Sequence, residues 1–436
     1  MTGGVQNIGR IPELQRRILF TFGMLIVYRI GAHIVTPGVN PEVIKAFFAQ
    51  MGGTVFGIFN LFSGGAMEQL SIFALGIMPY ISASIIFQLL TAAVPALERL
   101  KQEGEQGRKK ITQYTRYATV VLALFQSLLI STALESGQFG AGAVMEPGWG
   151  FRLLCMLTLT TGTAFIMWLG EQVTERGIGN GISLVIFSGI VIAIPGALGQ
   201  LGELVRTEQF TLLRALFLIG FMIVVTGFVV FFERGQRRIP IQHARRVVGK
   251  KVTQGGMSYF PLRVNTAGVI PPIFASSILM LPLTIGSFVD APELQAFIDE
   301  WLYFGGFAYN FVYVALIIFF AYFYTAIMID PVEVADNIKK FGGYIPGIRP
   351  GKKTAEYIDR ILSRLTLVGG IYVAAVCVLP VLLATWANVT FFFGGTALLI
   401  VVGVALDTIG QVESHLVSRQ YEGFTSGTRQ RGRLGR

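Results

Sequence analysis

Ten apolar segments constrain the fold of this chain more than any other feature. A bilayer core of about 30 Å requires roughly 20 apolar residues per helix, and backbone groups inside it must be paired within helices. Only 14% of the residues are charged, against about 25% in soluble proteins. We therefore expect an all-α, polytopic membrane protein with ten transmembrane helices. The segments cover residues 18–36, 70–94, 116–134, 151–170, 181–200, 211–232, 266–289, 304–329, 365–386 and 390–410.

The positions of the basic residues predict the topology. The chain has 35 Lys and Arg residues and a net charge of +10. Most of them lie before the first segment, after the last, and in every second connection. In contrast, only Lys45, Arg152, Arg206 and Arg214 lie in the alternate connections or at the segment ends beside them. Because basic loops stay in the cytoplasm, we expect both termini to be cytoplasmic, which agrees with an even number of spans.

The number of spans also suggests how the chain is divided. Five predicted helices end near residue 200 and five begin near 211. Five is odd, so two repeated halves would have to be inverted relative to each other, as in many transport proteins. No clear residue identity links the halves, so the repeat rests on the count of spans. We expect an N-terminal half over 1–200, a C-terminal half over 201–410 and a basic cytoplasmic tail over 411–436.

Residues 53–69, GTVFGIFNLFSGGAMEQ, are too apolar for a free loop and too short to cross the membrane. One interpretation is a re-entrant half-helix, which is tolerated at membrane depth only where protein or a water-filled cavity surrounds it. The other is an amphipathic segment on the outer surface. The sequence favours neither of the two.

Two long basic connections, 234–265 and 330–364, exceed what orientation in the membrane requires. They could fix topology and contact anionic lipid, or they could dock a large acidic partner such as ribosomal RNA or an acidic protein surface. In GIRPGKKT, Pro350 restricts Arg349 to extended backbone. Neither this stretch nor GKKVT matches the nucleotide-binding pattern G-x-x-x-x-G-K-[ST], so any energy for transport must come from a partner.

The spans contain few charged, nucleophilic or metal-binding side chains. Arg29 lies inside the first segment, where a snorkelling or structural pairing role is the natural interpretation. The two cysteines, Cys155 and Cys377, fall in separate apolar segments and predict no metal site. Without a carboxylate cluster, an H-E-x-x-H motif or a protease dyad, we expect no enzyme and no cofactor. A secondary transporter with inverted repeats remains an alternative function, and an intramembrane protease is a weaker one.

Isoleucines recur among small and polar residues in four of the segments. Ile77 and Ile81, and likewise Ile182 and Ile186, are spaced so that each pair shares a helical face. Any one isoleucine is most often packed against lipid. Six that met at the centre of the membrane, with Ile273 and Ile400 completing the set, would form a dry constriction that excludes ions by dewetting.

Long motifs identify a family. The chain contains NLFSGGAMEQLSIFALGIMPYISASI, GRKKITQYTRYAT, MWLGEQVTERGIGNGIS, FFERGQRR, VNTAGVIPPIFASS, ADNIKKFGGYIPGIRPG and FGGTALLIVV. In these motifs it resembles the SecY family, the pore-forming subunits of Sec protein-translocation channels, and the resemblance extends over nearly the whole chain. It implies a clamshell of two inverted five-helix halves around an hourglass pore, and a channel rather than an enzyme.

The resemblance also assigns sites. The pore ring would consist of Ile77, Ile81, Ile182, Ile186, Ile273 and Ile400. A re-entrant half-helix, the plug that fills the outer funnel, would span about 55–69 and include Phe59, Asn60, Leu61, Phe62, Ser63, Gly64 and Gly65. The lateral gate, between the second and third and the seventh and eighth helices, would contain Gln88, Gln126, Asn180 and Asn265.

The same resemblance implies partners and a location. The basic connections would dock the SecA motor or the ribosome through Arg237, Arg238, Arg245, Arg246, Lys250, Lys251, Arg349, Lys352 and Lys353. Family members act with the small membrane subunits SecE and SecG, and they receive nascent chains and signal sequences. We therefore expect a multi-pass protein of the cytoplasmic membrane that moves secretory polypeptides across the bilayer and releases membrane helices laterally.

Overall fold

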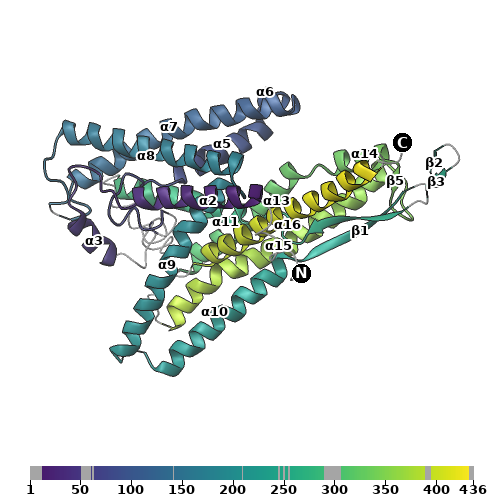
Figure 1. Ribbon diagram of the computed structural model, residues 1–436. Coiled ribbons are helices and arrows are strands. Elements are labelled where there is room, and N and C mark those ends of the chain that lie inside the picture. The colour runs from purple at the N-terminus through teal and green to yellow at the C-terminus, as the bar shows by residue number, and fades with distance from the viewer. Residues whose placement is uncertain are drawn as a thin grey trace. The chain divides into compact units, whose positions relative to one another are not determined.

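The computed structural model is mostly helical and contains two compact units (Figure 1). The first unit contains Met1–Gly202 and Ile400–Arg436, and the second contains Glu203–Leu399. The last long helix therefore belongs almost entirely to the first unit. The structure describes residues 12–50, 60, 63–140, 142–208, 210–243, 246–248, 251–253, 256–288, 306–387 and 394–431.

The first unit is built mainly from helices of 8 to 37 residues. They are α2 (Pro12–Gly31), α3 (Pro41–Gln50), α5 (Met78–Ala93), α6 (Pro95–Gln102), α7 (Glu105–Glu135), α8 (Trp149–Arg176), α9 (Gly181–Arg206) and α16 (Gly395–Arg431). In this unit α7 packs along both α8 and α5, and α2 packs against α8 (Figure 1). Helix α16 continues to Arg431, through most of the predicted tail.

Small hydroxyl side chains allow α7 and α8 to pack closely. Thr119, Ser127 and Ser131 on α7 are fully buried, and each donates its hydroxyl to a carbonyl three or four residues earlier in its own helix. Such residues let helix backbones approach while leaving no polar group unpaired. Near one end of the pair, Arg116 donates to Glu171 at 2.6 Å, and near the other Arg152 donates to Glu135 at 2.6 Å.

Two of the predicted spans differ from what the sequence suggested, because one is shifted and the other is shorter. Helix α2 ends at Gly31 rather than near residue 36. In the segment 70–94, the helix begins only at Met78, and residues 63–77, hereafter the turn segment, form consecutive turns and one bridge. At Val94, before Pro95, the chain bends by 97° from α5 into α6. Proline disfavours helical backbone in the residue before it, which explains the break.

The second unit has a helical part and a small mixed part. The helices are α10 (Leu212–Glu233), α11 (Ile270–Phe288), α13 (Phe307–Met328), α14 (Pro331–Lys340) and α15 (Lys352–Ala387). Helix α13 packs against α11 and α15. The rings of Phe232 on α10 and Tyr372 on α15 stack with centroids 4.0 Å apart, which joins α10 to the same group.

The mixed part contains strands, which the all-α expectation omitted. Strand β1 (Gln236–His243) lies between β4 (Met257–Arg263) and β5 (Gly343–Tyr344), and both pairings are antiparallel. The register pairs Ile239 with Phe260 and Gln242 with Tyr344. A second, two-stranded sheet joins β2 (Arg246–Val248) to β3 (Lys251–Thr253). The two long basic connections are therefore folded and linked by β1–β5 pairing.

The helices account for each predicted span, although not all of them qualify on length and composition alone. Within the described residues, seven helices are long and apolar enough to cross a membrane, and the bent pair α5 and α6 would make an eighth. Helix α2 carries Arg16, Arg17 and Arg29. Helix α11 contributes an apolar stretch of Ile270–Leu279 to the same search.

Candidate pore constriction, plug and docking surface

The first pair of predicted ring residues lies where α5 begins. Ile77 is the N-cap of α5 and is 2% exposed. The backbone N–H of Ile81 donates to the carbonyl of Ile77 at 3.1 Å, so the two side chains lie one helical turn apart, as their spacing predicts. Ile81 is half-buried. Pro79 is also in the first turn, where a missing N–H does no harm.

The second pair lies in the first two turns of α9. Asn180 starts this helix, because its side-chain oxygen accepts from the backbone N–H groups of Ile182 and Ser183 at 3.1 and 3.3 Å. Such caps satisfy donors that the first turn leaves unpaired. Ile182 packs against Gly170 of α8, where an added Cβ would lie 3.1 Å from its Cγ1. Ile186 is 5% exposed.

The remaining two ring residues come from α11 and α16. Ile273 lies in the second unit, and its carbonyl accepts from the hydroxyls of Ser276 and Ser277 at 3.0 and 2.8 Å. Hydroxyls bonded in this way often bend a helix. Ile400 is 2% exposed and lies in the first unit. None of the six isoleucine side chains is exposed.

The predicted plug overlaps the turn segment. Asn60 organises its start: its side-chain oxygen accepts from the N–H of Glu68 at 3.0 Å, and its amide donates to the Glu68 carboxylate at 3.2 Å. Gly64 and Gly65 have φ values of +66° and +81°, which glycine adopts without strain. From Ser63 onward the chain is therefore a series of turns and not the half-helix that we expected. Phe59, Leu61 and Phe62 lie outside the described residues.

Two neighbouring side chains of α2 hold the start of the turn segment. Tyr28 donates its hydroxyl to the carbonyl of Ser63 at 3.0 Å, and Arg29 donates from Nη1 to the carbonyl of Gly64 at 2.6 Å. Gly64 also contacts α9, because an added Cβ would lie 2.8 Å from the Cα of Gly189. Further along, Met67 and Leu70 belong to an apolar core with residues of α3, α7 and α8.

The predicted gate residues have different surroundings. Gln88 on α5 and Gln126 on α7 are half-buried on helices that pack together, and Gln88 donates to Ser84 at 3.3 Å. In the second unit, Asn265 is 5% exposed and donates to Glu233 at 2.7 Å and to the carbonyl of Gly268 at 3.2 Å. These bonds attach the chain before α11 to the end of α10.

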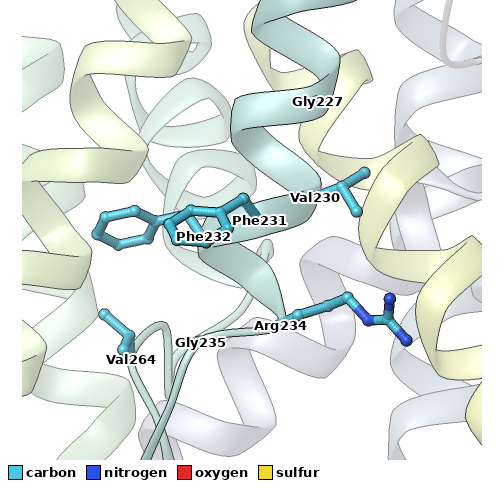
Figure 2. Close-up of a pocket in the computed structure, with 7 residues that line it drawn as sticks. All are labelled: Gly227, Val230, Phe231, Phe232, Arg234, Gly235 and Val264. Carbon is cyan, nitrogen blue, oxygen red and sulfur yellow. The ribbon is translucent and has the colours of Figure 1, made fainter.

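A shallow cavity adjoins this attachment. It has a volume of about 540 Å³ and is lined by Gly227, Val230, Phe231, Phe232, Arg234, Gly235 and Val264. Figure 2 shows Phe232 and Val264 on one side of it, while the Arg234 guanidinium points away from the aromatic rings. Its lining is mainly apolar, as expected near the end of a membrane helix.

The predicted docking residues lie on the mixed part of the second unit. Arg237 and Arg238 are on β1 and are exposed, as are Lys352 and Lys353 at the start of α15. Arg246 and Lys251 lie on the backbone of β2 and β3, whereas Arg245 and Lys250 fall outside the described residues. Arg349 is exposed in the turn before α15, and its carbonyl accepts from the Thr354 hydroxyl at 3.0 Å.

An apolar core supports this basic surface. Five buried residues from β1, β4, α15 and the turn after β5 form it: Ile239, Leu262, Ile345, Ile358 and Leu362. Helix α14 packs beside them, and the side chain of its N-cap Asp330 accepts from the N–H of Val332 at 2.8 Å. We call the strands β1, β4 and β5, the turn after β5, helix α14 and the first turns of α15 the basic module.

Sequence reasoning missed several of these contacts. The partners of Arg29 and Tyr28 lie 35 residues later in the chain, and no local sequence pattern predicts these contacts. The isolated charge at Arg29 was the only signal. The bond between Asn265 and Glu233 was also unforeseen. Within the described part of the chain, no group of three or more His, Cys, Asp or Glu residues could hold a metal ion.

Comparisons with known proteins agree on one family. The SecY family model matches residues 71–409. The protein translocase subunit SecY of Pseudomonas aeruginosa is 52% identical over 418 residues, which is 95% of this chain and 93% of that protein. SecY of Escherichia coli K12 is 49% identical over 417 residues, covering 95% and 94% of the two chains.

Solved structures share the fold. A SecY structure whose plug domain stabilises the closed state of the translocation channel matches with a TM-score of 0.65 and 20% identity, over 95% of this chain and 97% of that one. Sec61 from the canine ribosome–channel complex matches with a TM-score of 0.62 and 18% identity over the same shares. The helical, multi-pass membrane fold is thus confirmed, and the chain belongs to the SecY family of protein translocase subunits.

Proposed function

We propose that this chain is the central subunit of a protein-conducting channel in the cytoplasmic membrane. It moves secretory polypeptides across the bilayer and releases membrane helices laterally. The observation that carries this proposal is the set of six unexposed isoleucines on α5, α9, α11 and α16, in a chain that is 52% identical to a protein translocase subunit.

The isoleucines act as the pore ring. Apolar side chains around a narrow opening exclude ions because water leaves such a constriction. They also deform around many polypeptide sequences, because they require no specific hydrogen bond. Two serines that share the carbonyl of Ile273 support a helix that bends as the ring widens.

The turn segment, with the residues before it, acts as the plug. Its contacts with α2 and α9 support a closed resting position. A related SecY structure is described as having a plug that stabilises the closed state.

The proposed polar positions near the lateral gate are Gln88, Gln126, Asn180 and Asn265. A hydrophobic signal sequence opens that gate because its side chains gain roughly 25 cal/mol per Å² on leaving water, and the closed and open states differ by only a few kcal/mol.

The basic module binds the partner that supplies the energy for transport. Exposed Arg349, Arg237 and Arg238 on a folded support fit the acidic surface of a motor or the phosphates of ribosomal RNA. The Sec61 relative was solved in a ribosome–channel complex. We propose SecA and the ribosome as docking partners, SecE and SecG as small membrane subunits, and anionic lipid around the basic ends. Both termini then face the cytoplasm.

Crosslinking tests the ring. Single cysteines replace the six isoleucines in turn, in a chain whose Cys155 and Cys377 are alanine, and a secretory polypeptide is stalled during transport. We expect each position to crosslink to the stalled chain. Matched controls are Leu213→Cys and Leu157→Cys, which are 77% and 67% exposed on the helix surfaces and should not crosslink.

The result distinguishes a protein-conducting channel from a secondary transporter. Ring positions that react no better than the two control positions would contradict the channel. Uptake of a small solute by proteoliposomes that contain the chain alone would favour a secondary transporter instead. Replacement of the ring isoleucines by glycine or serine should raise ion leakage in planar bilayers, because the constriction becomes wider and wetter.

A further inference from the structure

Arg29 is an unusual residue for its position. It lies in the last turn of α2, and eleven uncharged residues separate it from Arg17. A cation within a membrane span is costly unless its donors are bonded. Its Nη1 donates to the carbonyl of Gly64 at 2.6 Å, and within the described part of the chain it forms no ion pair with a carboxylate. Its position at the C-terminal end of a helix also favours the positive charge.

The acceptor is presented by glycine backbone. Gly64 and Gly65 both have positive φ values, and this conformation directs the Gly64 carbonyl to Arg29. The neighbouring carbonyl of Ser63 accepts from Tyr28. On α9, the backbone at Gly189 leaves no room for a side chain at position 64. The three residues Ser63, Gly64 and Gly65, hereafter the plug tip, therefore contact α2 and α9 almost entirely through backbone.

The plug tip differs from the chain that follows it. Met67 and Leu70 are part of a large apolar core, whereas no residue of the plug tip belongs to it. Apolar burial is difficult to reverse in steps, because every buried side chain must be re-exposed to water. Two hydrogen bonds to carbonyls can break and re-form without such a cost. The plug tip is thus the part of the turn segment that is built to detach.

We propose that Arg29, assisted by Tyr28, is a latch that holds the plug tip closed, and that Arg29 sets the balance between closed and open channel. This rests on the proposed plug function of the turn segment. A charged donor binds a carbonyl more tightly than a neutral donor does. Because the acceptor carries no charge, the guanidinium loses only one hydrogen bond when the plug tip leaves, and water in the opened funnel replaces it.

Labelling of the plug tip tests the latch. Ser63→Cys is nearly isosteric and the position is 4% exposed. It is introduced into the full-length chain, in its membrane complex, with Cys155 and Cys377 changed to alanine. The rate of reaction with a water-soluble maleimide then reports how often the plug tip opens. We expect Arg29→Leu to raise this rate about tenfold, which corresponds to about 1.4 kcal/mol, and Arg29→Lys to raise it less.

The matched control is Arg206→Leu, which removes an arginine that is 82% exposed and paired with Glu203. It should leave the labelling rate unchanged. Equal labelling rates in Arg29→Leu and the parent chain, both recovered as folded complexes, would overturn the latch. If Arg29→Leu itself fails to fold, the same comparison is made with Arg29→Lys, and an unchanged rate there would also overturn it.

A second readout separates the latch from the channel. Resting ion conductance of the same variants is measured in planar bilayers. Faster labelling together with higher conductance supports both proposals. Faster labelling without any conductance supports the latch as a contact but contradicts the proposed channel. The labelling rate therefore tests the latch, and the conductance tests the channel.

Discussion

The plug tip and the basic module are held in place by opposite means. The plug tip makes two hydrogen bonds from α2 to its carbonyls and one close backbone contact with α9. The basic module is held by five buried side chains from two strands, a turn and a helix, of which Ile358 is completely buried. The contacts of the plug tip with α2 and α9 involve almost no apolar side chains of the plug tip, whereas the basic module depends on buried apolar side chains.

This difference matches what each region is proposed to do. A gate must reach two states whose free energies lie within a few kcal/mol of each other, and bonds that water can replace make that possible. A docking surface must transmit force or binding energy without deforming, and a close-packed apolar core does not yield gradually. The two regions thus differ in their kind of contact in the way that their proposed roles require.

The largest effect is expected from the core of the basic module. Ile358→Ala removes a completely buried side chain and should destabilise the module by about 2–5 kcal/mol, through lost transfer energy and a cavity. Hydrogen exchange of the β1 and β4 amides measures this. Lys352→Ala, on the exposed side of the same helix, should stay within about 0.5 kcal/mol. Equal exchange in the two variants would show that the module is not held by its core.

A charge reversal on the surface of the module should leave the fold intact and weaken docking. Arg349 is exposed and forms no ion pair within the described residues, so Arg349→Glu breaks no ion pair there. Facing an acidic partner, the new carboxylate should weaken binding by about 2 kcal/mol, roughly thirtyfold. Binding of the SecA motor to the purified complex measures it. Arg360→Glu is the matched reversal outside the predicted docking set, and a similar loss there would indicate a general charge effect.

The sequence predicted the helices and the basic connections better than it predicted the turn segment. Apolar length located a helix in each predicted span, but it missed the shorter helices α3, α6 and α14. The spacing of Ile77 and Ile81 was correct because helix periodicity is local. The basic connections were recognised from charge. Their β pairing was missed, since Gln242 and Tyr344 are about a hundred residues apart in the chain.

The turn segment shows why the rest could not be predicted. Its apolar composition resembles a helix, but positive φ values at Gly64, Gly65, Gly76 and even Leu70 divide it into turns. Composition does not report such backbone conformations. The partner of Arg29 is likewise set by tertiary contact, and only the cost of a charge inside a span signals that a partner must exist.

A glycine substitution tests whether the close contact with α9 holds the plug tip. Gly64→Ala combines a positive φ, which costs an L-residue about 1–2 kcal/mol, with a contact 2.8 Å from Gly189. Gly65→Ala has a similar φ but open space around its Cβ, so it isolates the strain. Maleimide labelling at position 63 should rise in both variants and more in Gly64→Ala. Equal rates would show that the contact with α9 does not hold the plug tip.

The smallest effect is expected from Tyr28→Phe, which tests whether charge or hydrogen-bond number holds the plug tip. The substitution removes only the bond from the hydroxyl to the Ser63 carbonyl. The ring keeps its stacking on Phe73, 5.9 Å away, and the Ser63 carbonyl still accepts from the N–H of Ala66 at 3.4 Å. Because neither partner is charged and the acceptor stays bonded, the loss should be about 0.5–1 kcal/mol, a two- to fivefold rise in labelling at position 63. A rise as large as that of Arg29→Leu would mean that the two bonds count equally, and the guanidinium would then lose its special role in the latch.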